Sequence, residues 1–288
     1  MVTRREAFAA LRQQLREGGL ESPDFEAACL LEHVLGASCR LMTRQQLEEP
    51  LTGEQAAALH ALTRRRLAGE PLQYLLGEWE FYGLPFAVGP GVLIPRQDTE
   101  TLVECALQAA EGMFAPSILD LCAGSGCIGI ALAHCLPDAR VTAVERSQDA
   151  LAYLHRNIEK NAVQVAVIAG DVLEPVLAAS IRGADIIVSN PPYLSAADLA
   201  ALQKEVQAEP RAALDGGEDG LLFYRQMPAL WLESLKPGGR LLFEIGMGQE
   251  EAVSGFLARA GYTNLEIFPD LAGISRVVSG RRPAGERR

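Results

Sequence analysis

The sequence predicts an α/β protein in which a mostly parallel sheet follows a small helical domain. Over residues 1–70, apolar side chains recur at helical spacing between polar helix caps. From residue 117 to residue 279, short apolar runs alternate with helical segments, which is typical of a parallel sheet covered by helices. At 288 residues, the chain is long enough for about two domains.

The first segment, 1–70, carries repeated signals for helix starts. Thr3-x-x-Glu6, Thr43-x-x-Gln46 and Thr52-x-x-Gln55 each fit the capping box, in which two side chains satisfy free N–H groups reciprocally. Ser22-Pro23 adds a cap followed by proline in the first turn. We expect about four short helices here. Because no catalytic group is evident, we expect a role in partner recognition or scaffolding.

Residues 71–95 differ in character from the helical segment. Glycine and proline interrupt two short apolar and aromatic runs, 78–82 and 84–88, which together predict a β-hairpin. We expect this segment to link the helical domain to a main domain over 96–280. The tail, 281–288, is expected to be disordered.

The main domain shows a regular series of elements. Lys236–Gly239 is interpreted as a helix stop that leads into a strand. Strands are expected at 117–121, 140–145, 165–168, 184–189, 240–245, 264–268 and 274–279, with helices at 101–110, 127–136, 147–160, 222–235 and 249–260.

The charge balance limits the class of partner. Asp and Glu number 37 against 26 Lys and Arg, for a net charge of −11. A protein that mainly binds a nucleic-acid backbone needs a basic surface, so nucleic acid is expected only as an indirect partner. Arg64–Arg66 is a local exception that we interpret as a solvated helix end.

The cysteines and histidines show no metal-binding pattern. The six cysteines form no C-x-x-C pair, and the four histidines are scattered, so no metal site is expected. Free cysteines fit a reducing, cytoplasmic location. The most apolar stretch, Ile118–Leu136, contains Asp120 and three glycines, so it is interpreted as strand, loop and buried helix and no membrane anchor is expected.

The first strand of the main domain leads into a glycine-rich loop, Cys122-Ala123-Gly124-Ser125-Gly126, and then a helix. Glycines let the backbone approach a ligand, and the helix N-terminus offers free N–H groups. The spacing Gly124-x-Gly126-x-x-Gly129 matches the dinucleotide-binding fingerprint, and Glu145, which ends the next strand, lies at about the distance at which its carboxylate can accept from ribose hydroxyls. The loop alone fits both a nicotinamide dinucleotide and S-adenosylmethionine.

Two later strand ends separate these cofactors. Asp171-Val172 follows the third strand, where an acidic side chain can bind an adenine amino group. Asn190-Pro191-Pro192-Tyr193 ends the fourth strand, because proline cannot continue a sheet ladder. At the carboxyl edge of a sheet, a carboxamide, a proline carbonyl and an aromatic ring suit a planar group that bears NH2. This motif favours methyl transfer to nitrogen over hydride transfer.

On these motifs the chain resembles the release-factor glutamine methyltransferases (the PrmC/HemK family), from its helical start to residue 279. The strings that carry the resemblance are Gly91–Glu100, Asp120–Gly126, Asn190–Tyr193 and Glu209–Gly217. It implies a seven-stranded Rossmann-like class I methyltransferase sheet whose last strand is antiparallel, with an N-terminal helical domain and a β-hairpin linker. It also implies methyl transfer from S-adenosyl-L-methionine to the glutamine amide in the Gly-Gly-Gln motif of peptide chain release factors, the expected protein partner.

Three sets of site residues follow from the motifs and the resemblance. Cofactor binding is expected from Cys122, Ala123, Gly124, Ser125, Gly126, Glu145, Asp171, Val172 and Asn190. Substrate binding is expected from Asn190, Pro191, Pro192 and Tyr193, and catalysis from Asn190, Pro191 and Tyr193. The Asn190 oxygen and the Pro191 carbonyl would accept the substrate N–H groups, while the ring of Tyr193 packs on the amide plane.

Two positions depart from the family pattern. The family often has Gly and Thr where this chain has Cys122 and Ala123, and Asp is commoner than Glu at position 145. Backbone contacts survive the first change if the loop tolerates a β-carbon. Glu145 keeps the carboxylate but adds a methylene, so we expect the ribose to lie slightly further away.

Other functions remain open from the residues alone. A ribosomal-protein glutamine methyltransferase differs mainly in the N-terminal domain and the Glu209–Gly217 string. A DNA amino methyltransferase uses the same four-residue motif, but the charge disfavours it. An NAD-linked oxidoreductase and a non-catalytic adaptor are less consistent with Asn190–Tyr193.

Overall fold

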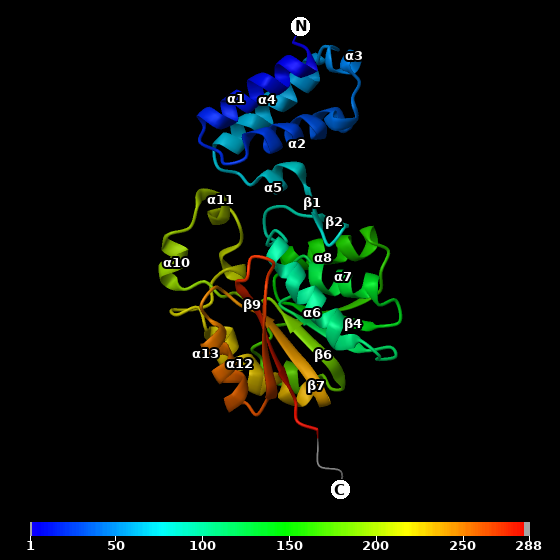
Figure 1. Cartoon of the computed structure of the whole chain (residues 1–288), viewed down its shortest axis with the longest axis vertical. Coiled ribbons are helices and arrows are strands. Elements are labelled where there is room, and N and C mark those ends of the chain that lie inside the picture. The colour runs from blue at the N-terminus through cyan, green and yellow to red at the C-terminus, as the bar shows by residue number, and fades with distance from the viewer. Residues whose placement is uncertain (1, 285–288) are drawn as a thin grey trace. The chain divides into compact units, whose positions relative to one another are not determined.

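The computed structural model describes residues 2–284 (Figure 1). The chain forms two compact units, a helical unit of Met1–Glu78 with Gln203–Ala208 and a sheet unit of Trp79–Leu202 with Glu209–Arg288. The change of unit after Glu78 falls inside the segment expected to link two domains. The inclusion of Gln203–Ala208 in the helical unit was not predicted, because this short segment has no sequence pattern that assigns it to either unit.

The helical unit begins with three helix starts that confirm the predicted capping boxes. Thr3, Thr43 and Thr52 each accept from the N3 backbone, and the N3 side chain accepts in return. Ser22 makes no side-chain cap hydrogen bond, because its ψ of 57° departs from the extended backbone typical of a cap. The helices are α1 (Arg4–Glu17), α2 (Pro23–Leu35), η1 (Cys39–Leu41), α3 (Arg44–Leu47), α4 (Gly53–Leu67), α5 (Leu72–Leu76) and α11 (Lys204–Gln207).

The prediction that Arg64–Arg66 is a solvated helix end is wrong for one arginine of α4. Arg66 is buried rather than solvated, and it forms a two-pronged ion pair with Glu26 of α2 at 2.5 and 3.0 Å. Its NH2 group also lies 2.6 Å from Glu205 of α11. Arg65 keeps the predicted exposed position and pairs with Glu70. The sequence did not show which arginine of the triplet faces inward, because α2 and α11 supply the partners.

The sheet unit opens with the predicted hairpin, in which β1 (Glu78–Phe81) pairs with β2 (Leu84–Ala87). Its main sheet has seven strands in the order β5-β4-β3-β6-β7-β9-β8, and β9 runs antiparallel to both of its neighbours. This confirms the predicted fold class. The strands are β3 (Ser117–Leu121), β4 (Arg140–Glu145), β5 (Val165–Ala169), β6 (Ala184–Ser189), β7 (Leu235–Glu244), β8 (Thr263–Pro269) and β9 (Ser275–Arg281).

Helices cover both faces of this sheet (Figure 1). On one face Trp231, Tyr224 and Phe243 are among the largest buried side chains of the core. The α-helices of the unit are α6 (Glu100–Ala110), α7 (Cys127–Cys135), α8 (Gln148–Lys160), α9 (Pro175–Ser180), α10 (Ala196–Ala200), α12 (Leu222–Trp231) and α13 (Glu250–Arg259). Its described residues also form three short 3-10 turns: η2 (Gln97–Thr99), η3 (Arg211–Ala213) and η4 (Leu232–Ser234).

The start of β7 differs from the prediction. The strand begins at Leu235 rather than at 240, so the predicted helix stop Lys236–Gly239 lies within it, and α12 ends at Trp231. Leu235 pairs with Ala184 on the far side of a register shift, and the regular ladder resumes at Ile186. Long-range pairing with β6 therefore extends the strand through residues that locally favour a turn.

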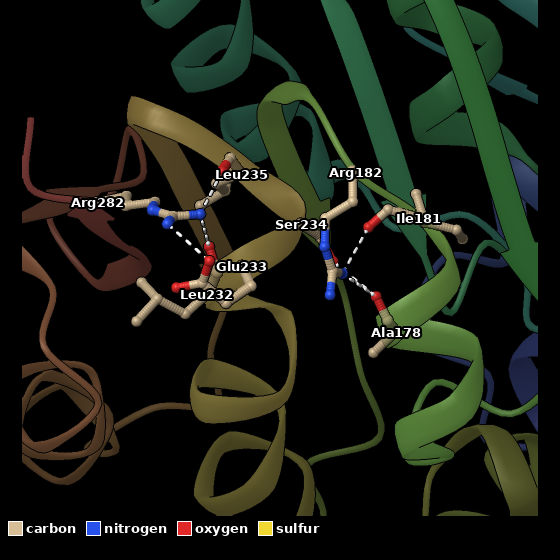
Figure 2. Close-up of polar contacts among 8 residues, drawn as sticks. All are labelled: Ala178, Ile181, Arg182, Leu232, Glu233, Ser234, Leu235 and Arg282. Carbon is tan, nitrogen blue, oxygen red and sulfur yellow. Dashed lines mark hydrogen bonds and ion pairs between the residues drawn. The ribbon is translucent and has the colours of Figure 1, made fainter. Parts of the chain in front are cut away.

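Two arginines satisfy backbone carbonyls near the starts of β6 and β7, at the amino edge of the sheet (Figure 2). Arg182 donates to the carbonyl of Ala178 in α9 at 2.8 Å. Arg282 donates to the carbonyls of Leu232 and Leu235 at 3.0 and 2.6 Å. Helix ends leave carbonyls without intrahelical partners, so these contacts stabilise the edge opposite the strand ends that carry the predicted site.

The prediction of a disordered tail over 281–288 starts too early in the sequence, because its first residues are ordered. Arg281 is the last residue of β9, and the backbone N–H of Arg282 donates to the carbonyl of Gly239 at 2.8 Å. Pairing with β7 orders these residues. Residues 285–288 lie outside the described part of the chain.

Candidate active site

A pocket lies at the carboxyl ends of β3, β4, β5 and β6 and encloses about 670 Å³ of space, part of it open to solvent. The sheet order reverses at β3, and open α/β sheets bind ligands at such a switch point. The lining residues are Gly91, Val92, Leu93, Cys122, Gly124, Val144, Glu145, Arg146, Ser147, Ala150, Gly170, Asp171, Val172, Asn190, Pro192, Pro210, Ala212, Ala213 and Phe223.

The glycine-rich loop after β3 supplies one wall of the pocket. Cys122 and Gly124 line it, whereas Ala123 and Ser125 are buried behind them. Gly126 has φ +82°, and a β-carbon there would approach Leu154 to 2.2 Å. Cys122 has φ +62°, a left-handed conformation that costs a residue with a β-carbon about 1–2 kcal/mol. The loop tolerates this β-carbon at an energetic cost.

Glu145, at the end of β4, is held by three backbone N–H groups. Oε2 accepts from Gly124 at 2.8 Å, while Oε1 accepts from Arg146 at 2.8 Å and Ser147 at 2.7 Å. An ionised carboxylate has about four lone-pair sites. The arrangement therefore fixes the carboxylate against the loop and leaves a site on Oε2 for a hydroxyl of a ligand.

Asp171 lies across the pocket, after β5. Its Oδ1 accepts from the backbone of Leu173 at 2.9 Å, and its Oδ2 pairs with the Arg146 guanidinium at 2.9 Å. The carbonyl of the neighbouring Val172 accepts from the indole of Trp231 at 2.9 Å. Arg146 was not predicted as a site residue, although it directly follows Glu145 and could have been found from that position.

The motif after β6 is held from several sides. Ser189 donates to the Leu121 carbonyl at 2.7 Å, which ties the strand end to β3. The Asn190 side chain donates from Nδ2 to the Thr99 hydroxyl at 3.2 Å. Asn190 and Pro192 line the pocket, while Pro191 is buried and Tyr193 is half-buried outside the lining set. Burial raises the pKa of Tyr193 to about 12, so its phenol is neutral at physiological pH.

A cross-connection braces the chain just after this motif. Leu194 exchanges backbone hydrogen bonds with Leu214 and Gly216, both at 2.9 Å. A β-carbon on Gly216 would come within 2.8 Å of the Tyr193 Cα, so close approach requires glycine there. The Gln249 side chain donates to the Tyr193 carbonyl at 3.1 Å. The string Glu209–Gly217 therefore supports the motif directly.

The same string meets Gly91–Glu100 at the pocket wall. Glu209 is buried, accepts from the backbone of Ile94 at 3.0 Å and forms an ion pair with Arg96. Residues of both strings line the pocket. None of these lining residues was predicted to bind a ligand, although both strings stood out by resemblance, because nothing local indicates that they meet.

A buried carboxylate, Glu244, lies beside Asn190 and was also missed. Burial raises its pKa to about 7, while hydrogen bonds from Thr99 and Asn190 act in the opposite direction. Its Oε2 is buried and has no hydrogen-bond partner among the described residues. Glu244 lies at the end of a predicted strand, the position that marked Glu145, so it could have been found. The sequence does not show that its carboxylate is buried beside Asn190.

Comparisons with known proteins agree with this geometry. The Methyltransferase small domain model matches residues 97–230, and the PrmC N-terminal domain model matches residues 6–77. The chain is 47% identical to the release factor glutamine methyltransferase of Geobacter sulfurreducens, over 94% of this chain and 93% of the relative. It is 43% identical to that of Moorella thermoacetica, over 96% and 97%.

A solved structure, a methyltransferase from Pyrococcus furiosus, matches with a TM-score of 0.52 over 81% of this chain and 100% of the other at 16% identity. That likeness shows the fold. The curated relatives extend over nearly the whole length of both chains. The chain therefore belongs to the family of release factor glutamine methyltransferases.

Proposed function

We propose that this enzyme transfers a methyl group from S-adenosyl-L-methionine to the side-chain amide nitrogen of the glutamine in the Gly-Gly-Gln motif of peptide chain release factors. The observation that carries the proposal is the Asn190 carboxamide at the pocket wall. Its NH2 end is turned to Thr99, which leaves its oxygen to accept from a substrate. The relatives' names support a glutamine of a release factor as that substrate.

The pocket suits S-adenosyl-L-methionine, which when bound supplies an electrophilic methyl group on a sulfonium sulfur. Glu145 offers a free carboxylate lone pair for a ribose hydroxyl, and Asp171 is a second anchor for the adenine amino group. We assign cofactor contacts to the pocket-lining residues Cys122, Gly124, Glu145, Asp171, Val172 and Asn190. Ala123, Ser125 and Gly126, which do not line the pocket, shape the loop.

The chemical difficulty lies in the amide nitrogen, whose lone pair is delocalised into the carbonyl. Losing that conjugation altogether costs on the order of 18–20 kcal/mol, the rotation barrier of an amide, and transfer requires only part of it. The Asn190 Oδ1 atom and the Pro191 carbonyl would each accept one substrate N–H. Two fixed acceptors aim the lone pair and stabilise positive charge that grows on nitrogen.

The remaining motif residues complete the substrate site. Pro192 lines the pocket and would exclude water beside the amide. Tyr193, neutral because burial raises its pKa to about 12, would pack on the amide plane. No general base is needed, because the proton can leave the nitrogen after the methyl group has been transferred.

The rest of the chain would serve recognition. We assign partner recognition to the helical segment 1–70, the linker to 71–95 and the chemistry to 96–280. Within the described residues, no helix is both long and apolar enough to cross a membrane. Six free cysteines and a release-factor substrate favour the cytoplasm as the compartment of the reaction.

The test is incubation of the enzyme with cofactor carrying a labelled methyl group and purified release factors, followed by mass mapping. We expect one methyl group on the glutamine of the Gly-Gly-Gln motif and none on a release factor with that glutamine replaced by Ala. Ribosomal proteins and DNA are the matched alternative substrates. Label that appears only on one of these would assign the substrate to that class instead.

A further inference from the structure

The end of β7 places a buried carboxylate directly beside the Asn190 side chain. In the parallel pairing of β6 and β7, Ser189 is opposite Phe243, so the next residues along the two strands, Asn190 and Glu244, are neighbours. Glu244 is 2% exposed. Burial costs free energy for a charged group unless the group is paired. A buried carboxyl group at this position is therefore not explained by stability alone.

Three polar side chains meet at this point. The Asn190 Nδ2 group donates to the Thr99 hydroxyl at 3.2 Å, and the side chains of Thr99 and Asn190 both hydrogen-bond Glu244. The Glu244 Oε2 atom is buried and has no partner among the described residues. The contacts of Thr99 and Asn190 are therefore to the other carboxylate oxygen, and Glu244 retains unused acceptor capacity on Oε2.

We propose that Glu244 is a positioning residue that determines which end of the Asn190 carboxamide faces the substrate. The inference rests on the proposed function, because it concerns the oxygen that would accept the substrate N–H. An ionised carboxylate only accepts hydrogen bonds, so it holds the NH2 end of Asn190 and leaves Oδ1 toward the pocket. A protonated carboxyl group can donate to Oδ1, which would turn the NH2 end outward, where it cannot accept.

The charge state of Glu244 responds to groups on several surrounding elements. Burial raises its pKa most, Asp98 of η2 raises it further, and Arg276 of β9 lowers it. The negative charge of Glu244 in turn raises the pKa of three neutral side chains, those of Cys127, Tyr193 and Tyr224. With a pKa of about 7, Glu244 changes its protonation within the physiological range, and the ionised form is the one that orients Asn190 for acceptance.

The decisive test compares Glu244→Gln with the wild type across pH 5.5 to 9, with turnover measured on a release factor. The wild type is expected to gain turnover as pH rises through about 7. The Gln variant has the same shape but no titrating proton, so we expect this rise to disappear and kcat to fall about tenfold. Glu244→Leu removes the acceptor, and we expect kcat to fall about 100-fold because misplacement of a reacting group has effects of that size.

Two controls separate positioning from folding. Ser279 of β9 is also buried, and its hydroxyl has no partner within residues 2–284, so Ser279→Ala should keep both kcat and the pH profile. Cofactor affinity by calorimetry should be unchanged in both Glu244 variants. If Glu244→Leu does not fold, the isosteric Gln variant alone decides.

The outcomes also distinguish this inference from the proposed function. Loss of activity in Asn190→Ala, combined with a Glu244→Gln variant that keeps wild-type kcat and its rise near pH 7, would overturn the role of Glu244 alone. Full activity in Asn190→Ala would overturn the role of Asn190 as well, whereas a wild-type enzyme that leaves the release-factor glutamine unlabelled would overturn the proposed function. A Gln variant that loses cofactor affinity at unchanged kcat would show that Glu244 shapes the cofactor site instead.

Discussion

Arg66 in the helical unit and Glu244 in the sheet unit are both buried charged side chains, but they are partnered in opposite ways. Arg66 contacts two carboxylates and a backbone carbonyl. Glu244 leaves one oxygen without a partner in the described part of the chain. Removing one partner of a paired buried charge is strongly destabilising, whereas an incompletely paired buried carboxylate has a perturbed pKa of the kind found at functional sites. The first serves structure and the second serves the site.

The largest effect is expected for Arg66→Met. Removing one member of a buried ion pair leaves the carboxylate of Glu26 uncompensated, which should lower the free energy of unfolding by about 3–5 kcal/mol. Urea denaturation of the variant and the wild type measures this difference in the free energy of unfolding. The matched control is Arg65→Met, because the Arg65–Glu70 pair is exposed and such pairs contribute about 0–1 kcal/mol. Equal losses in the two variants would remove the structural role assigned to Arg66.

The next effect concerns activity rather than stability. Asn190→Ala should lower kcat about 100- to 1,000-fold, the loss typical of removing one fixed group that stabilises transition-state charge. Cofactor affinity should fall much less, because Asn190 is one of six residues assigned to cofactor contacts. The measurement is steady-state kinetics on a release factor. Asn161→Ala, which removes only a contact to the Pro85 carbonyl and a helix-end contact, should keep full activity. Near-wild-type turnover in Asn190→Ala with unchanged cofactor binding would refute the role given to Asn190.

A smaller effect is expected on stability at the Glu244 site. Its pKa is about 7 in the folded chain against an ordinary value of 4.5, so the folded protein binds the proton more tightly. The contribution of Glu244 to stability therefore falls as pH rises from about 4.5 to 7 and stays low above that. Glu244→Gln should be more stable than the wild type by roughly 1–3 kcal/mol at pH 8 and nearly equal at pH 4.5.

Thermal and urea unfolding at the two pH values test this directly. Asp120 is also buried with a pKa near 7, but it is present in both proteins and cancels in the difference. A Gln variant that gains stability while it loses turnover would show that the chain keeps Glu244 for function. If Glu244→Gln is less stable than the wild type at pH 8, the charge of Glu244 stabilises the fold, as the charge of Arg66 does.

The smallest effect on the free energy of unfolding is expected for Cys122, where the site contains backbone strain rather than a buried charge. Cys122→Gly relieves the left-handed backbone at φ +62°, but glycine also raises the entropy of the unfolded chain. The net change should stay within about 1 kcal/mol. Cofactor affinity, measured by calorimetry, should be unchanged, because the backbone path is the same. A large loss of affinity would mean that the thiol itself contacts the cofactor.

Much of the sheet unit could be predicted from local sequence. Strand and helix periodicity, the glycines of the loop after β3 and the prolines after β6 act through backbone dihedral angles and hydrogen-bonding capacity, which depend on residues close in the chain. For the same reason the capping boxes at Thr3, Thr43 and Thr52 were predicted correctly. Asn190, Glu145 and Asp171 were found because each ends or follows a predicted strand.

The tertiary structure alone decided which distant side chains meet. Glu244 lies beside Asn190, Glu209 pairs with Arg96, and Arg66 is buried against Glu26. These contacts depend on strand order, register and helix packing, which join segments far apart in sequence and leave no local pattern. The sequence by itself therefore determined the motif that presents an amide and its cofactor loop. Long-range packing determined which groups orient that amide, because only packing brings a buried carboxylate to its side.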